Sequence, residues 1–228
     1  MNDLESQKAA AALAAVSEVS DGMLVGLGTG STAAYAVKEI GRRVTEGSLK
    51  IRAVATSVAT DTLARSVGID VIGFEDVSQV DLTIDGADEI DPSFNAVKGG
   101  GGALLREKVV ASASKRTIII VDSSKPVEYL GLFKLPIEIL PFAVNWVEYS
   151  LRLLDGNPKR RMRRDDTPFL TDQGNMILDT DFGLIKNPGR LAAELDNIPG
   201  IVEHGLFLTE IDSVYIGRPE GVEIKHKT

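Results

Sequence analysis

The sequence predicts an α/β fold, with a Rossmann-like parallel sheet covered by helices on both faces and a smaller α+β domain. In the first half of the chain, short apolar segments alternate with segments of helical periodicity, which is typical of right-handed βαβ units. Around Pro126–Pro141 this alternation stops, and strands and helices follow in another order. A length of 228 residues suits one large domain, or a large domain together with a small one.

The first-half strands are predicted from short apolar runs that end in glycine or a polar residue. They are 23–28, 51–56, 80–86 and the β-branched run 117–122. The helices between them carry apolar residues at helical spacing. They are 4–19, 31–46, 58–67 and 103–114. Ligands of such sheets bind beyond the carboxyl ends of the strands, and each chemically unusual segment of this half follows a strand.

The second half is predicted to contain a small α+β domain. Its elements are a strand at 135–141, a helix at 144–155, a polar strand at 159–166, a hairpin at 169–182 with its turn at Asp172–Asn175, a short helix within 187–200 and a strand at 201–207. The tail, 214–225, can return to the first sheet. The predicted domains are therefore 1–130 with 208–228, and 131–207.

Composition excludes several classes of function. The net charge of −8 argues against nonspecific binding to nucleic acid or to an anionic membrane. No run of about 18 apolar residues predicts a membrane span. Cysteine is absent, which excludes disulfides, thiol nucleophiles and cysteine metal sites. The N-terminal segment lacks the basic region of a secretory signal, so we expect a cytoplasmic protein.

A glycine-rich loop, Gly26–Thr32 with the sequence GLGTGST, lies between a predicted strand and a helix. Its glycines expose backbone N–H groups, and Ser31 and Thr32 can cap the helix, so the loop predicts an anion site, most naturally for phosphate. The alternative is a plain capped turn. A dinucleotide site is disfavoured because the second strand ends without an acid, and the GK[ST] sequence of nucleotide triphosphate loops is missing.

Two carboxylates, Asp85 and Asp88, flank Gly86-Ala87 at the end of a predicted strand. Both can face one pocket and accept hydroxyl groups or transfer protons. Magnesium held by two aspartates and a glutamate is one alternative, although no histidine joins them in a ligand-spaced cluster. A solvated acidic turn is another.

Next along the chain, Lys98 precedes four glycines that run directly into a helix. Successive N–H groups beside a cation suit an enolate oxygen or a phosphate, whereas the alternative is a flexible loop. In that helix Glu107 has apolar neighbours one turn away, so we expect burial and a raised pKa that suits a general base. The alternative is a surface acid paired with Arg106 or Lys108.

Basic residues give weaker signals. Lys125 follows a strand, and Lys8 lies on the first predicted helix; both could face a substrate anion, although each could be an ordinary surface lysine. The run KRRMRR at 159–164 could suggest nucleic acid binding. It lacks interleaved aromatic residues and is followed at once by Asp165-Asp166, which favours a solvated strand.

In their order and spacing, GLGTGSTA, DGADEID, KGGGGALLREK and DSSK resemble ribose-5-phosphate isomerases of the A type. The resemblance continues through LPIEILPFA, TDQGNMILD, IPGIVEHGLF and GVEIK. It implies interconversion of ribose 5-phosphate and ribulose 5-phosphate in the pentose phosphate pathway, without metal or cofactor. It also implies a homodimer or a tetramer, to which the smaller domain contributes.

By position, the resemblance makes Glu107 the general base and Lys98, Asp85 and Asp88 further catalytic groups. The substrate-binding residues implied are Thr29, Gly30, Ser31, Thr32, Asp85, Gly86, Ala87, Asp88, Lys98, Gly99, Gly100, Gly101, Lys125 and Lys8. Two departures are visible: the family often has alanine where Gly102 stands and threonine where Leu105 stands. They concern the stiffness of the glycine loop rather than the reaction.

Two other classes of protein share parts of this pattern. A sugar-phosphate-sensing module would keep the pocket without needing Glu107, and it would usually carry a DNA-binding segment. A CoA-transferase-like enzyme would use a catalytic glutamate that forms an acyl intermediate, and it would need a CoA site.

Overall fold

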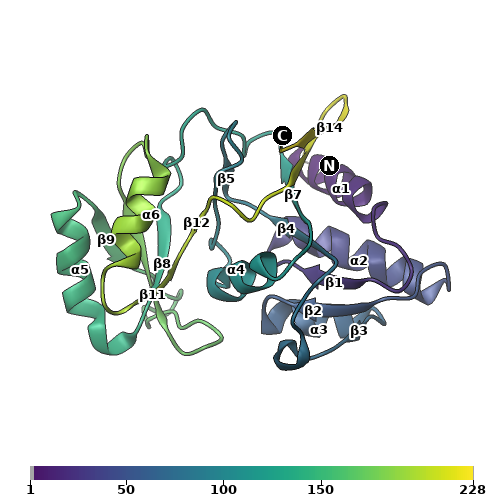
Figure 1. Cartoon of the computed structure of the whole chain (residues 1–228), viewed down its shortest axis with the longest axis horizontal. Helices are drawn as coiled ribbons and strands as arrows, with labels where there is room; N and C mark the ends of the chain where they lie inside the picture. Colours follow the sequence, from purple (N-terminus) through teal and green to yellow (C-terminus); the bar gives the residue numbers. More distant parts are fainter. Residues whose placement is uncertain (1–2, 228) are drawn as a thin grey trace. The chain divides into compact units, whose positions relative to one another are not determined.

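The computed structural model describes residues 3–227, which form two compact units (Figure 1). Unit 1 comprises the described residues up to Ala87, Arg106–Lys125 and the described residues from Glu210 onward. Unit 2 comprises Asp88–Leu105 and Pro126–Thr209. The segment 88–105 thus lies in unit 2, although the predicted first domain includes it. Because compact units are defined by contacts and not by independent folding, the predicted domains stay a prediction.

Unit 1 is built on a seven-stranded sheet with the strand order β14-β13-β7-β4-β1-β2-β3. Its strands are β1 (Leu24–Leu27), β2 (Arg52–Ala55), β3 (Asp70–Val71), β4 (Leu82–Gly86), β7 (Thr117–Asp122), β13 (Ser213–Arg218) and β14 (Gly221–His226). Neighbouring strands are parallel except for β14, which pairs antiparallel with β13 at one edge. The predicted parallel sheet and the return of the tail to it are confirmed.

Helices cover both faces of this sheet, as predicted. They are α1 (Asp3–Val16), α2 (Ser31–Thr45), α3 (Val58–Ser66) and α4 (Leu104–Ser112). Successive residues of a strand point to opposite faces, and β2 shows the consequence. Ala53 belongs to the core formed with α1 and α2, whereas Val54 packs with Val80 and with Val110 of α4.

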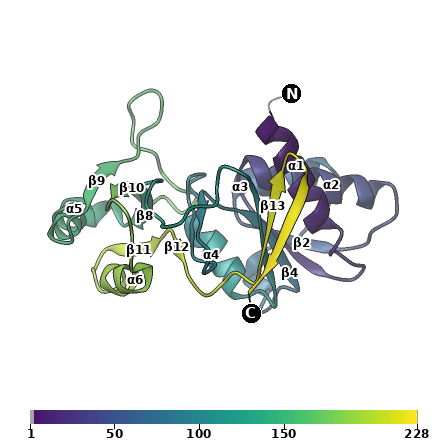
Figure 2. The same ribbon diagram turned by 90° about the horizontal axis from the view of Figure 1, so that it is seen from above.

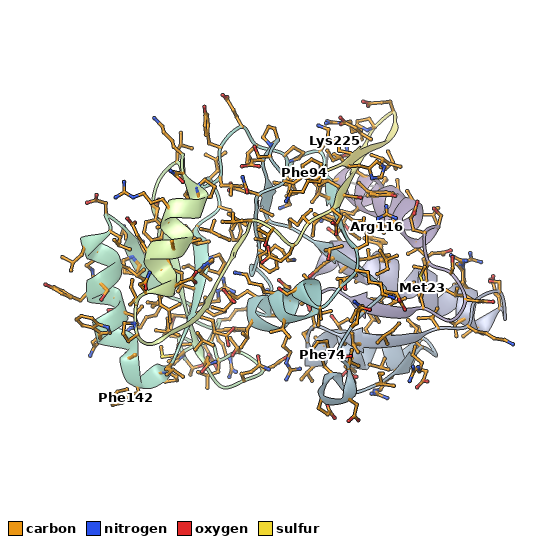
Figure 3. The ribbon with its side chains drawn as sticks, in the orientation of Figure 1. Met23, Phe74, Phe94, Arg116, Phe142 and Lys225 are labelled. Carbon is orange, nitrogen blue, oxygen red and sulfur yellow. The ribbon has the colours of Figure 1, made fainter. Side chains whose placement is uncertain are left out.

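The residues just beyond α1 connect this helix to the sheet. Arg116, labelled in Figure 3, donates a 2.9 Å hydrogen bond to Glu18, and the hydroxyl of Tyr215 donates a 3.2 Å hydrogen bond to the same carboxylate. Arg116 precedes β7 and Tyr215 lies in β13, so one acid joins α1 to two neighbouring strands.

Unit 2 contains a four-stranded antiparallel sheet with the order β11-β8-β10-β9. Its elements are β8 (Leu135–Ile139), α5 (Val144–Leu153), β9 (Asn157–Arg160), β10 (Met176–Asp181), α6 (Pro188–Asp196) and β11 (Ile201–His204). Both helices pack on one face, where Val147 and Leu195 meet Ile137 and Leu178. A small sheet, β12-β6-β5, joins β5 (Glu89–Ile90), β6 (Ala96–Val97) and β12 (Leu206–Phe207).

The basic run departs from the prediction. Strand β9 ends at Arg160, so the predicted strand over 159–166 is confirmed only for Lys159 and Arg160 and is wrong for the rest; Figure 2 shows a long loop between β9 and β10. Within it the N–H of Arg163 donates to the carbonyl oxygen of Thr167, and Asp166 has a φ of 59°. Aspartate tolerates this left-handed conformation and favours turns. The chain therefore reverses where the acidic pair follows the arginines.

The predicted hairpin over 169–182 is confirmed in part. The N–H of Thr171 donates to Asn175 across the predicted turn, and Gly174 has a φ of 78°. Only the second arm forms a strand, because Leu170 makes no more than an isolated bridge to Met176. No helix among the described residues is long and apolar enough to cross a membrane.

Candidate active site

Three of the predicted functional segments of unit 1 lie at or just beyond the carboxyl ends of strands. Residues 28–32 follow β1, Asp85 lies near the end of β4, and Ser123–Lys125 follow β7. Strand β4 lies between β1 and β7 and runs parallel to both. These segments therefore meet at one edge of the sheet, which is where ligands of parallel sheets bind.

Asp85 is held in a fixed position by the first of these loops. Its side chain is buried, and Oδ1 accepts hydrogen bonds from the N–H of Thr29 (3.1 Å) and the N–H of Gly86 (2.7 Å). A Cβ atom on Gly28 would lie 2.1 Å from the same oxygen. Residue 28 must therefore be glycine for this carboxylate to fit.

The hydroxyl of Thr29 anchors the loop. It lies 2.7 Å from Oγ1 of Thr56 and 2.8 Å from Oγ of Ser57, while the hydroxyl of Thr60 donates to the carbonyl oxygen of Gly28 at 3.0 Å. These partners lie before and within the first turn of α3. Thr56, Ser57 and Thr60 were not among the predicted site residues, because they become neighbours of Thr29 only when β1 and β2 pair.

Helix α2 begins beyond the loop without a side-chain cap. Gly30 is its N-cap with a φ of 111°, so the expectation that Ser31 and Thr32 cap the helix is wrong; they occupy its first turn. The Lys8 ammonium lies 3.5 Å from Oγ of Ser31. A cation beside an uncapped helix N-terminus favours an anion.

Lys8 is held by Glu5 and Tyr35, neither of which was a predicted site residue. Its ammonium donates a 2.7 Å hydrogen bond to Glu5, which raises the pKa of the lysine above its ordinary value. The hydroxyl of Tyr35 donates to the other Glu5 oxygen at 2.8 Å. Lys8 therefore stays cationic at neutral pH, in a position set from α1 and α2.

Lys125 lies on the loop after β7, and this loop is tied to α1. The N–H of Ser123 donates a 3.0 Å hydrogen bond to the buried side chain of Gln7. The N–H of Lys125 donates to the carbonyl oxygen of Asp122 at 3.2 Å. Lys8 lies on α1 and Lys125 on the loop after β7, and the hydrogen bond from Ser123 to Gln7 joins these two segments.

Glu107 is buried in α4, with 2% of its surface exposed. Val110 and Ala111, one turn later, are buried as well. The apolar spacing thus predicted the burial of this carboxylate correctly, and the alternative of a surface acid is wrong.

In unit 2, the carboxylate of Asp88 packs directly against Gly100, as the carboxylate of Asp85 packs against Gly28. Its Oδ2 accepts a 2.8 Å hydrogen bond from the N–H of Gly100. A Cβ atom on Gly100 would lie 2.6 Å from Oδ1. Here too the absence of a side chain permits the close approach of a carboxylate.

Lys98 and the glycines after it form a defined turn rather than a flexible loop. Lys98 is buried, with its ammonium 5.3 Å from the centre of the Phe207 ring. The N–H of Gly102 donates to the carbonyl oxygen of Gly99 at 3.0 Å, and these glycines have φ values of 81° and 102°. The N–H of Lys98 donates to Gly205. Several of the expected N–H donors are therefore already bonded within the protein.

Comparison with known proteins identifies the family. Residues 52–221 match the model of ribose 5-phosphate isomerase A (phosphoriboisomerase A).

The chain belongs to this family. It is 55% identical to ribose-5-phosphate isomerase A of Sphingopyxis alaskensis over 100% of its own length and 99% of that relative. A D-ribose-5-phosphate isomerase solved in complex with phospho-erythronic acid superposes with a TM-score of 0.96 at 37% identity, covering 99% of this chain and 100% of that one. Ribose 5-phosphate isomerase A of Methanocaldococcus jannaschii superposes with a TM-score of 0.93 at 38% identity, covering 98% and 99%. The resemblance drawn from the motifs is confirmed.

One of the two departures from the family pattern, Gly102, is explained by a specific contact. A Cβ atom on Gly102 would lie 2.5 Å from Cζ of Phe169, and Gly102 has a positive φ. The ring of Phe169 therefore occupies the space that an alanine side chain would need. No comparable contact explains the second departure, Leu105.

Two acids that follow Asp88 closely in sequence, Glu89 and Asp91, have structural roles in this isomerase-family fold. The buried carboxylate of Glu89 accepts hydrogen bonds from the N–H groups of Gly131 (2.7 Å) and Phe133 (2.6 Å). Asp91 accepts from the N–H of Asn95 at 2.9 Å and closes a turn. Among the described residues, no group of three or more acids, histidines or cysteines is placed to hold a metal ion.

Proposed function

We propose that this protein is an aldose–ketose isomerase that interconverts D-ribose 5-phosphate and D-ribulose 5-phosphate in the non-oxidative branch of the pentose phosphate pathway. The observation that carries the proposal is family membership along the whole chain, with 55% identity to a ribose-5-phosphate isomerase A. The substrate is a phosphorylated metabolite, for which we propose a cytoplasmic site of action.

Glu107 is the proposed base. The reaction moves a proton from C2 of the open-chain aldose to C1, and one carboxylate over the C1–C2 edge can remove and return it through a cis-enediolate. Burial makes this carboxylate a better base than a solvated one, because a desolvated anion gains more from accepting a proton. The carboxylate oxygen would need to lie within hydrogen-bond reach of both carbons.

The oxyanion that develops on the enediolate needs fixed donors. Lys98 supplies a buried ammonium, and charge stabilisation is strong where water is excluded. The N–H of Gly100 already holds Asp88. The backbone donors that we assign to the substrate are therefore those of Gly99 and Gly101.

Asp85 and Asp88 are the proposed partners of the sugar hydroxyls. Opening of the ring needs an acid and a base at the ring oxygen and the anomeric hydroxyl, and the enediolate needs a proton moved between O1 and O2. Two backbone N–H groups fix Asp85 and one fixes Asp88, which lowers the cost of aligning each carboxylate with a hydroxyl. Gly86 and Ala87, between them, carry no bulky side chain that would obstruct the sugar.

The phosphate is assigned to the start of α2. Thr29–Thr32 supply the loop and the first helical N–H groups, and Lys8 and Lys125 supply positive charge. Binding energy from this remote group positions the reacting carbons, so it contributes to the rate as well as to affinity.

We infer a homodimer, with a tetramer as the alternative. One surface of unit 2 supports self-association, namely the stripe of η2 (Pro141–Ala143) and α5. Its large apolar side chains share one helix face and are exposed: Phe142 (100%, Figure 3), Trp146 (53%), Tyr149 (56%) and Leu153 (66%). A two-fold axis would lay this stripe against its copy. Light scattering should report a dimer or a tetramer that Trp146→Glu weakens.

A coupled isomerase assay on the purified protein tests the proposed function. Ribose 5-phosphate should yield ribulose 5-phosphate at a rate proportional to enzyme concentration. Binding of ribose 5-phosphate without turnover would indicate a sensing module instead. Transfer of CoA between acyl donors, with a covalent acyl–glutamate, would indicate a CoA-transferase.

A further inference from the structure

We propose that Arg161 is a positioning residue of the glycine loop. It holds the peptide units of Gly99 and Gly100, and through them it orients Asp88 and the backbone donors beside Lys98. This inference rests on the proposed function, and it gives a role to one arginine of the basic run 159–164.

The contacts of Arg161 define this role. Its Nη1 donates to the carbonyl oxygens of Gly99 at 2.9 Å and Gly100 at 3.2 Å. Its Nε and Nη2 both donate to the carboxylate of Asp179 in β10, which forms a two-pronged pair. The side chain of Arg161 is 14% exposed. Leu178 of β10 packs against α5 and α6, so its neighbour Asp179 points to the opposite face of the unit 2 sheet. Arg161 pairs with Asp179 on that face, which α5 and α6 do not cover.

Because the peptide unit is planar, a hydrogen bond that fixes its carbonyl group also fixes the direction of its N–H group on the opposite side of the loop. In a planar trans peptide, the carbonyl group and the N–H that follows it point in opposite directions. The carbonyl of Gly99 accepts from Arg161, and the N–H of the same peptide unit donates to Asp88 at 2.8 Å. One peptide plane therefore links the guanidinium to the carboxylate.

The next peptide unit is held in the same way. The carbonyl of Gly100 accepts from Arg161, so the N–H of Gly101 points away from the guanidinium. Glycines rotate freely about both backbone bonds, and this stretch would otherwise sample several orientations. Arg161 selects the orientation that turns N–H groups away from itself.

Arginine suits this position better than lysine would. Its planar fork can donate to Asp179 and to two carbonyl oxygens at once, whereas an ammonium cannot match that geometry. The ring of Phe169 lies 5.8 Å from the guanidinium carbon and also fills the space beside Gly102. Arg163 and Arg164, in the same run, are exposed and provide matched controls.

The first test compares Arg161→Gln and Arg161→Lys with Arg163→Gln in the isomerase assay. We expect kcat to fall roughly ten- to a hundredfold for Arg161→Gln and less for Arg161→Lys, because a small misplacement of catalytic groups is costly. KM should change less than threefold, because the assigned phosphate groups are untouched. Arg163→Gln should match the wild type. Folding is checked by circular dichroism.

A double-mutant cycle separates positioning from general support of the fold. If Arg161 acts through Asp88, Arg161→Gln should cost little further activity in an Asp88→Asn background. Wild-type kcat in folded Arg161→Gln, or losses that multiply in the double mutant, would overturn the proposal.

Hydrogen exchange of the Gly100 amide, followed by NMR, tests the same inference without turnover. Exchange should be at least tenfold faster in Arg161→Gln, or in Arg161→Lys if the first variant does not fold. An unchanged rate would overturn the inference. A wild-type protein that fails to isomerise ribose 5-phosphate would contradict the proposed function alone.

Discussion

Asp85 and Asp88 each lie against a glycine, and this arrangement makes two residues without side chains as important as the carboxylates. A Cβ atom on Gly28 or on Gly100 would overlap the neighbouring carboxylate. The backbone also donates to both acids, through Thr29 and Gly86 in one case and through Gly100 in the other. Charged groups fixed in this way need little reorganisation during a reaction.

At Glu107, replacement by glutamine should remove the proton acceptor while preserving size. General bases contribute about 10²–10⁴-fold, so kcat of Glu107→Gln should fall by at least 10²-fold. Substrate affinity should change little, and the fold should persist because a buried charge is removed rather than created. The measurement is kcat together with exchange of the C2 proton into deuterated solvent.

A matched control for this variant is Glu194→Gln, a partly exposed glutamate that pairs with Arg190 on α6. It should retain wild-type activity. If Glu107→Gln kept the wild-type rate of C2 exchange, another residue would be the base, and Asp85 would be tested next.

Lys125 should act mainly in binding. The loss of one charged hydrogen bond costs about 1.5–3 kcal/mol, so Lys125→Ala should raise KM roughly ten- to a hundredfold while kcat changes little. Steady-state kinetics measure both constants. Lys225→Ala, on the exposed strand β14, should leave them unchanged. Equal turnover of ribose and ribose 5-phosphate at low concentration would contradict the assignment of a phosphate site.

The turn that follows Lys98 should tolerate a side chain at position 102 poorly. Gly102→Ala should lower the free energy of unfolding by about 1–2 kcal/mol for its left-handed backbone. Overlap with the Phe169 ring should cost about 1–3 kcal/mol more. Urea unfolding of Gly102→Ala, measured in the wild type and in a Phe169→Leu variant, gives the coupling between positions 102 and 169. The cost of Gly102→Ala should fall by more than about 0.5 kcal/mol in Phe169→Leu, and strict additivity would mean that the ring does not limit this position.

Between α1 and the sheet, Glu18 should stabilise the fold in a pH-dependent manner. The hydrogen bond from Arg116 lowers the pKa of this carboxyl below its ordinary value of 4.5. The unfolded chain therefore takes up a proton first as the pH falls. The stabilisation is complete above the unfolded pKa and is lost as the pH drops through the lower folded pKa.

Glu18→Gln should accordingly lower the free energy of unfolding by about 0.2–1 kcal/mol at pH 7, since the pair is partly exposed. The difference from the wild type should shrink below pH 4.5. Urea unfolding from pH 7 to pH 3.5 measures it, with Glu220→Gln in the turn before β14 as the control. A difference that grew as the pH fell would show that the sign is wrong.

For the molecule as a whole, the proposed mechanism assigns every step to side chains and backbone groups of the chain itself. Activity should therefore survive prolonged chelation followed by dialysis. Assays before and after treatment, with metal analysis of the dialysed protein, provide the measurement. Activity lost on chelation and restored by magnesium would require a revised mechanism.

The main features of the fold could be predicted because they depend on local pattern. Residues Ile118–Val121 of strand β7 are all apolar and β-branched, as a central parallel strand requires, and this strand lies in the interior of the sheet. The spacing around Glu107 likewise predicted its burial. Both signals are contained within a few residues of sequence.

The supporting contacts could not be predicted, because they depend on the register of distant segments. Gly28 meets Asp85 only once β1 and β4 pair, and Arg161 meets Gly99 only once its loop leaves β9. Glu89 gives a further example. In sequence it was available as the glutamate of the alternative magnesium site, whereas its carboxylate accepts hydrogen bonds from the backbone of residues 131 and 133.

Strands β7 and β13 are neighbours in the sheet of unit 1, but they are synthesised far apart in time. Strand β7 leaves the ribosome long before β13, its neighbour in the sheet, because residues 126–209 of unit 2 come between them. Until then, the hydrogen-bonding edge of Ile118–Val121 is unpaired, and such an edge invites pairing with other chains. During synthesis, nascent unit 1 therefore passes through an aggregation-prone stage that ends when residues 213–218 emerge.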